Sequence, residues 1–105
     1  MQKRNALPPL IAIDFPRRNE KVSSEHYSLR VATQGEGAVE ISLDGGPWEA
    51  CRPAVGFWWF DWTEYGPGRH EAVARIRAQD GRIWESLPTP FRVEFDQVTM
   101  GKEVG

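Results

Sequence analysis

The chain contains one cysteine, two histidines and no long apolar run, and each shortage excludes a class of protein. A single cysteine, Cys51, cannot form an internal disulfide framework, and with two histidines it supplies too few ligands for a structural zinc site. No segment approaches the roughly 18 apolar residues of a transmembrane helix. We therefore expect no membrane insertion, no metal and no cofactor.

Positive charge is also scarce. The 13 lysines and arginines are outnumbered by 15 aspartates and glutamates, so the formal net charge is −2. Binding to phosphate backbones needs a basic surface, and nucleic acid is therefore not an expected partner. Near the N-terminus, Pro8 and Pro9 interrupt the apolar stretch and leave it too short for an export signal. The sequence predicts a cytoplasmic location, with export of a processed form left open.

Helical periodicity is missing almost everywhere. Instead, short alternating apolar and polar segments are separated by glycine, proline and Asp-Gly pairs, as in strands joined by turns. We predict an all-β fold, an immunoglobulin-like two-sheet sandwich of about seven short strands. It is expected to span residues 10–97, between a flexible N-terminal segment at 1–9 and a flexible C-terminal tail at 98–105. The expected strands are 10–15, 27–32, 39–43, 48–52, 57–62, 70–78 and 91–95, with a short return at 83–84.

Aromatic residues are concentrated in one place, because three of the five tryptophans lie within residues 58–62. Side chains alternate between the two faces of a strand, so one aromatic set is expected in the core and another on the outer face. The outer set is either covered by a neighbouring segment, around Trp48 or in the 16–25 loop, or marks a contact site. The core set is Trp58, Phe60 and Trp62, and the outer set is Phe57, Trp59 and Asp61.

Three motifs follow one another along the chain. From Val39 it reads Val-Glu-Ile-Ser-Leu-Asp-Gly-Gly-Pro-Trp, then Trp-x-Phe-x-Trp-Thr, then, from Gly68, Gly-x-His-Glu-Ala-Val-Ala-Arg-Ile-Arg-Ala-x-Asp-Gly. Over residues 38–82 this order resembles bacterial immunoglobulin-like and fibronectin type III-like modules. It is also similar to the dimerisation domain of sulfite oxidases. The resemblance implies a spacer, a dimerisation surface or a ligand platform, and it places His70 at the start of a strand.

No set of residues points to catalysis. A calcium site would need several oxygen ligands at loop spacing, and the four candidate aspartates lack that spacing. His26, Cys51 and His70 belong to no recognised nucleophile motif, so we expect structural roles for them and no enzyme activity. The molybdenum-binding domain of sulfite oxidases is not part of these 105 residues, so Cys51 is not assigned as a cofactor ligand. The four aspartates are Asp14, Asp44, Asp61 and Asp80.

The leading hypothesis is a non-catalytic protein–protein interaction or assembly module. Its partner would be another protein or a second copy of the chain, because tryptophan is a favoured interface anchor. The alternative is a carbohydrate-binding module in which exposed tryptophans form a platform and Asp61 and Glu64 bind sugar hydroxyls. An accessory domain of a larger redox assembly is suggested by the sulfite oxidase likeness alone. The predicted binding surface consists of Phe57, Trp59, Trp48, Trp84 and Asp61.

Overall fold

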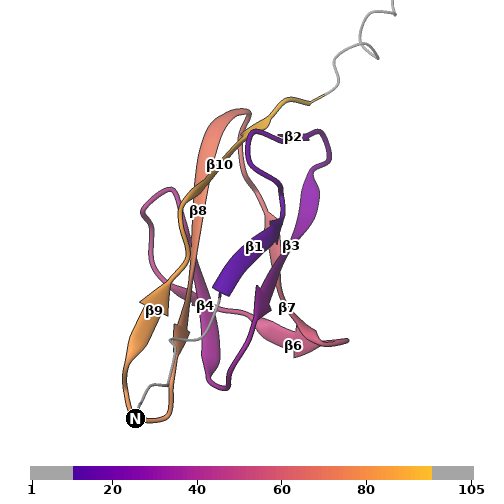
Figure 1. Ribbon diagram of the computed structural model, residues 1–105. Coiled ribbons are helices and arrows are strands. Elements are labelled where there is room, and N and C mark those ends of the chain that lie inside the picture. The colour runs from indigo at the N-terminus through magenta and orange to yellow at the C-terminus, as the bar shows by residue number, and fades with distance from the viewer. Residues whose placement is uncertain (1–10, 96–105) are drawn as a thin grey trace, which may run out of the picture.

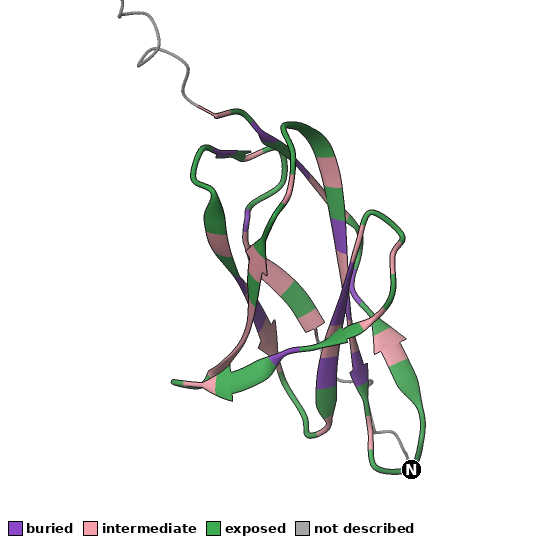
Figure 2. Ribbon diagram, turned by 180° about the vertical axis from the view of Figure 1, so that it is seen from behind, coloured by how far each residue is buried: buried purple, intermediate pink, exposed green. Residues whose placement is uncertain are grey.

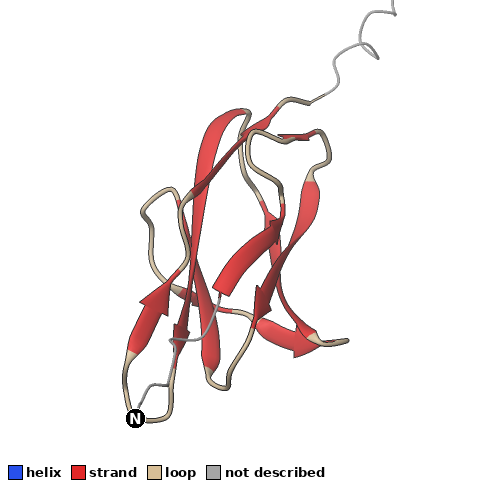
Figure 3. Ribbon diagram, in the orientation of Figure 1, coloured by secondary structure: helices blue, strands red, loops and turns tan. Residues whose placement is uncertain are grey.

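The computed structural model describes residues 11–95, and these form two β-sheets packed face to face (Figure 1). Figure 3 shows only strands and loops over this range, and no helix long and apolar enough to cross a membrane occurs in it. The segments at 1–9 and 98–105, predicted to be flexible, lie outside the described residues. The strands are β1 (Ile11–Phe15), β2 (Lys21–Val22), β3 (His26–Thr33), β4 (Ala38–Leu43), β5 (Glu49–Ala50), β6 (Arg52–Ala54), β7 (Phe57–Thr63), β8 (Gly68–Arg77), β9 (Ile83–Glu85) and β10 (Thr89–Val93).

One sheet has four strands in the order β1-β3-β7-β6, and the other has six. In the six-stranded sheet the order is β2-β10-β8-β4-β5, and β9 pairs with β8 beyond the end of β10. All pairs are antiparallel except β2 with β10. The prediction of an all-β, immunoglobulin-like two-sheet sandwich is confirmed.

Ten strands appear where about seven and a short return were expected, because β2 lies in the segment expected to be the 16–25 loop and one expected strand is divided. The segment expected as one strand at 48–52 is split at the buried Cys51, where the chain leaves the six-stranded sheet after β5 and enters the four-stranded sheet as β6. The expected return at 83–84 is strand β9, and Ser86 follows its end. The amide of Ser86 donates to the Ala74 carbonyl at 2.7 Å, and its hydroxyl accepts from the Ala74 amide at 3.0 Å.

The turn after β4 illustrates how local sequence fixes the chain path. Asp44 and Gly45 both have positive φ, 56° and 73°, and the Gly46 amide donates to the Leu43 carbonyl at 2.9 Å. Two central residues of positive φ define a type I′ turn, for which Asp-Gly is a preferred pair. This turn was predicted from the Asp-Gly-Gly sequence.

The core lies between the two sheets, and buried and exposed residues alternate along the central strands (Figure 2). The partly buried side chains of Trp58, Phe60 and Trp62 pack against this core, as predicted for the inner face of β7. That face of the aromatic strand is therefore used for folding. The buried apolar residues are Val22, Leu29, Val31, Val39, Ile41, Cys51, Ala72, Ala74, Ile76, Phe91 and Val93.

Candidate binding surface

The outer face of the four-stranded sheet carries the other half of the aromatic strand. In the register of β3 with β7, Trp59 lies opposite Arg30 and Asp61 opposite Ser28. Phe57 and Trp59 are half-buried, and their ring centroids lie 6.3 Å apart at an interplanar angle of 75°. We call the surface formed by Arg30, Arg52, Phe57, Trp59 and Asp61 the outer aromatic face.

Two contacts fix the rings of this face. The indole Nε1–H of Trp59 donates to the carbonyl of Ala54 at 2.9 Å. The guanidinium carbon of Arg30 lies 4.1 Å from the centroid of the Phe57 ring, within the range of a cation–π contact. Neither contact comes from the Trp48 segment or the 16–25 loop, the two covers considered from the sequence. The rings are therefore held in fixed orientations and keep part of their surface open.

The charged groups of the outer aromatic face are paired with one another. Asp61 accepts two hydrogen bonds from Arg52, both at 3.1 Å, and one from the Ser28 hydroxyl at 2.9 Å. The hydrogen bonds from Arg52, and then from Ser28, hold the pKa of Asp61 below its ordinary value. Arg30 pairs with Asp14 at 3.2 Å. The outer aromatic face therefore combines partly open rings with charged groups that are already paired.

The structure does not bring the five predicted surface residues together. Trp48 lies beside the six-stranded sheet, where the Arg75 guanidinium is 4.1 Å from its ring centroid. Trp84 pairs in register with the buried Ile76 and packs against the core. Of the five predicted residues, only Phe57, Trp59 and Asp61 share the outer face of the four-stranded sheet. The prediction that Trp48 or Trp84 lies near Phe57 and Trp59 is wrong, because alternation assigns a face within a strand but not the sheet that the strand joins.

The four aspartates considered for calcium each have a separate partner. Within residues 11–95, no group of three or more histidine, cysteine, aspartate or glutamate side chains is arranged to hold a metal ion. Each aspartate instead stabilises a local turn or strand pair, as aspartate commonly does. The pairs are Asp14 with Arg30, Asp44 with His70, Asp61 with Arg52 and Asp80 with Arg82.

The surroundings of Cys51 and His70 fit structural roles: the thiol is buried, and the imidazole is held through both ring nitrogens. Cys51 is 7% exposed, and its burial, followed by the nearby charge of Glu40, raises the pKa of its thiol to about 12. A thiol with that pKa stays protonated near neutral pH and is a poor nucleophile. His70 begins the buried part of β8 and is held through both ring nitrogens, by Asp44 at 2.7 Å and by the Gly66 carbonyl at 2.8 Å.

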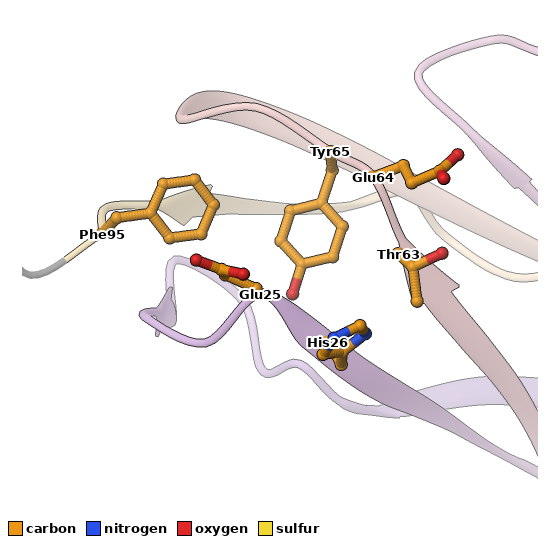
Figure 4. Close-up of a pocket in the computed structure, with 6 residues that line it drawn as sticks. All are labelled: Glu25, His26, Thr63, Glu64, Tyr65 and Phe95. Atoms are coloured by element: carbon orange, nitrogen blue, oxygen red, sulfur yellow. The ribbon is translucent and has the colours of Figure 1, made fainter.

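A pocket of about 360 Å³ lies at one end of the sandwich (Figure 4), and no sequence pattern predicted it. Its residues come from the start of β3, the end of β7 and the segment after β10, and these segments are far apart in the chain. Only the tertiary fold brings them together. The pocket is lined by Glu25, His26, Thr63, Glu64, Tyr65 and Phe95.

Comparison with known proteins gives structural neighbours but no family. No family model matches the chain, and no curated protein matches it. The fibronectin(III)-like modules of Clostridium thermocellum CbhA superpose with a TM-score of 0.68 at 20% identity, covering 80% of this chain and 94% of that one. CopC from Methylosinus trichosporium OB3b has a TM-score of 0.63 at 18% identity, with coverages of 83% and 94%.

A third neighbour is a modular endo-β-1,4-mannanase from Cellulomonas fimi, with a TM-score of 0.60 at 15% identity. The match covers 83% of this chain but only 19% of the mannanase. These likenesses show the fold, an immunoglobulin-like and fibronectin III-like β-sandwich, and they provide no link to sulfite oxidases.

The predicted cytoplasmic location is corrected by the same comparison. CbhA, the mannanase and CopC are extracellular or periplasmic proteins, so the neighbours point away from the cytoplasm. The prediction depended on Pro8 and Pro9, which interrupt the apolar stretch near the N-terminus. That interruption concerns one short segment, whereas the comparison concerns the fold of the whole module.

Proposed function

We propose that this fibronectin III-like sandwich is a non-catalytic accessory module that binds another protein, or a second copy of itself, through the outer aromatic face. One observation carries the proposal: Phe57 and Trp59 lie together on an outer sheet face and keep part of their surface open. Two structural neighbours are described as modules or as part of a modular enzyme, which supports an accessory role.

The rings have the properties of interface anchors. Tryptophan is among the residues that contribute most to binding energy when a partner covers it. The hydrogen bond from Trp59 to Ala54 and the Arg30 contact on Phe57 restrict both rings in the free protein. A restricted side chain loses less conformational entropy on binding, so less of the contact energy is lost to ordering.

The hairpin between β6 and β7 extends the apolar surface. It projects from the body of the sandwich in Figure 1 and carries Val55, which is 88% exposed. Val55 has a φ of 53°, a left-handed conformation that is costly for a β-branched residue. Val55, two positions before Phe57, is strained and exposed and therefore contributes little to stability. Contact with a partner is the role that we propose for it.

A shallow pocket of about 220 Å³ opens beside this face. Its lining includes Arg52, Trp59 and Asp61, together with Ala50 and Phe60. The side chains of Arg52 and Asp61 are both more than half exposed. They can therefore form hydrogen bonds with a partner, and they remain paired with each other in the free protein. The face therefore offers apolar anchors, a small recess and a polar edge, which is the usual composition of a protein interface.

Light scattering coupled to size exclusion, over a range of concentrations, tests self-association. The informative variants are Trp59→Ala and Val55→Asp, and Trp48→Ala is the matched control because Trp48 lies beside the other sheet. Val55 is exposed, so its substitution separates loss of binding from loss of folding. A dimer that both surface variants dissociate, while the control does not, supports the proposal for self-association.

If the wild type is a monomer at every concentration, the test turns to binding of a different protein. A photo-crosslinking amino acid is then placed at position 55 or, as the control, at position 48, and the protein is exposed to lysate of its source cells. Reproducible crosslinks from position 55 that Trp59→Ala abolishes would support the outer aromatic face. Equal crosslinking from positions 48 and 55 would contradict it.

The carbohydrate-binding alternative is favoured by one observation, the likeness to part of a modular endo-β-1,4-mannanase. The angle of 75° between the Phe57 and Trp59 rings counts against a flat platform at the predicted place. Titration of tryptophan fluorescence with manno-oligosaccharide tests it. A saturable change that Trp59→Ala removes would support this alternative over the protein-binding proposal.

A further inference from the structure

The pocket at the end of the sandwich is a second candidate site, separate from the outer aromatic face. Glu25 precedes β3 and His26 begins it, while Thr63 ends β7 and Glu64 and Tyr65 follow (Figure 4). Phe95, after β10, forms the opposite side. The volume of about 360 Å³ is near the lower end of the range for small-ligand pockets and suits a group the size of one side chain.

The aromatic wall of the pocket is fixed in the free protein. Tyr65 stacks on Trp62 with centroids 3.8 Å apart and planes at 17°. Its hydroxyl donates to the Ser24 carbonyl at 2.6 Å. Phe95 lies nearly parallel to Tyr65, at 19°, with centroids 6.2 Å apart, and Figure 4 shows the two rings side by side. Two ring faces are thus held in place at the pocket.

The remaining lining consists of two acidic residues, Glu25 and Glu64, together with His26 and Thr63. Glu25 and Glu64 are exposed, and within residues 11–95 neither has a cationic side chain within ion-pair distance. Among the residues that the structure describes, no lysine or arginine lines the pocket. Glu25 lines the same pocket as the Tyr65 and Phe95 rings (Figure 4). A carboxylate beside aromatic ring faces attracts a cation twice, by its charge and by the ring quadrupoles. The same arrangement repels anions.

We propose that this pocket binds an organic cation, the ammonium of a lysine or the guanidinium of an arginine side chain presented by a protein partner. The cation lies against the Tyr65 and Phe95 rings, and Glu25 and Glu64 supply the opposite charge. The proposal is independent of the outer aromatic face, because the two sites share no lining residue. Each of these contacts is weak by itself, because exposed cation–π contacts and exposed ion pairs are screened by water and salt.

An NMR titration of the full chain tests the proposal. The probe is Nα-acetyl-lysine methylamide, and its Nε-acetylated form is the neutral control of nearly the same shape. We expect saturable shifts of the amide signals of His26, Glu64 and Tyr65 with the charged probe, weaker at high salt because exposed ion pairs are screened. The neutral form should leave these signals unchanged.

Variants separate the site from unspecific attraction. Glu25→Gln should weaken binding about threefold, since one exposed ion pair is lost, and Phe95→Leu should remove most of the shifts. Glu36→Gln is the matched control, because Glu36 is exposed in the segment that follows the other end of β3. Unchanged dispersion of the remaining amide signals shows that each variant is folded.

Three outcomes would overturn the proposal: no saturable shift with the charged probe, an equal response to the acetylated form, or an equal loss in Glu36→Gln. Saturable shifts with a neutral manno-oligosaccharide and none with lysine would assign the pocket to sugars instead. A lysine-containing tripeptide that binds more tightly than the single-residue probe supports a protein partner. Equal affinity supports the cation site but overturns its assignment to a peptide.

Discussion

The imidazole Nδ1 of His70 lies 2.7 Å from the Asp44 carboxylate Oδ2, and this contact joins the turn after β4 to the start of β8. The other Asp44 oxygen accepts from the Glu71 amide at 2.8 Å, and the Asp44 amide donates to the Glu71 carbonyl at 2.8 Å. The second imidazole nitrogen lies 2.8 Å from the Gly66 carbonyl. Both neighbours of the ring are acceptors, so the protonated imidazole, which has two donors, satisfies both contacts.

Stability should therefore depend on pH through His70. Burial alone would lower the pKa of His70, but the hydrogen bonds to Asp44 and Gly66 and the Asp44 charge together raise it above its ordinary value. A raised pKa in the folded state means that this stabilisation is complete below the unfolded value of about 6.5 and is lost as pH rises through the folded value. Urea unfolding from about pH 5.5 to pH 8.5 measures the effect.

His70→Gln should flatten the pH dependence over this window, because glutamine has no titrating proton. Asp44→Asn is the second variant, since it removes the charge that favours protonation. A wild-type unfolding midpoint that rises between pH 6.5 and pH 8, or a dependence unchanged in His70→Gln, would contradict the assignment.

Val55→Asn should stabilise the protein. Val55 and Gly56 have φ values of 53° and 81° between β6 and β7, the pattern of a type I′ turn, and Asn-Gly is preferred there. Removing a β-branched residue from the left-handed region should add about 1 kcal/mol to the free energy of unfolding. Chemical denaturation measures it, with Val55→Ile as a control that keeps the branching. A loss of stability in Val55→Asn would show that the valine contributes packing that exposure does not reveal.

Gly37→Ala should destabilise the protein by about 1–3 kcal/mol. A Cβ at Gly37 would collide with the backbone carbonyl oxygen of Arg77 and approach Cγ1 of Ile76 to 2.9 Å. Gly66→Ala is the control, because a Cβ there would meet nothing within 4 Å. Thermal unfolding compares the two. Equal stabilities of the two variants would show that the end of β8 can shift at little cost.

Cys51 should resist alkylation in the native state. Its burial, and then the charge of Glu40, raises the pKa of the thiol to about 12, so almost no thiolate is present at pH 8. Iodoacetamide labelling followed by mass spectrometry should show slow modification without denaturant and complete modification in high urea. Rapid labelling of the folded protein would mean that the segment between β5 and β6 opens readily.

The outer aromatic face shows which structural features the local sequence pattern predicts. The alternation along β7 correctly separated Phe57 and Trp59 from the inward-facing aromatic residues, because successive side chains of a strand point to opposite faces whatever the strand pairs with. The Asp-Gly-Gly turn was predictable for a similar reason. Its backbone conformation is decided by residues 44 and 45 themselves.

The placement of Trp48 and Trp84 was not predictable in this way. The sheet that a strand joins depends on hydrogen bonds and burial between residues distant in the chain, and apolar burial has no preferred direction. Trp48 and Trp59 are only 11 positions apart in the chain, yet they lie beside different sheets.

The sequence by itself determined an all-β chain, the two faces of the aromatic strand β7 and the hairpin turn at Asp44, since these depend on neighbours along the chain. Tertiary structure alone decided the sheet of each strand, the pairing of Asp44 with His70 and the pocket that joins Glu25, Tyr65 and Phe95. Those arrangements depend on long-range strand pairing, in which many registers satisfy the local pattern and the packing of the whole core selects one.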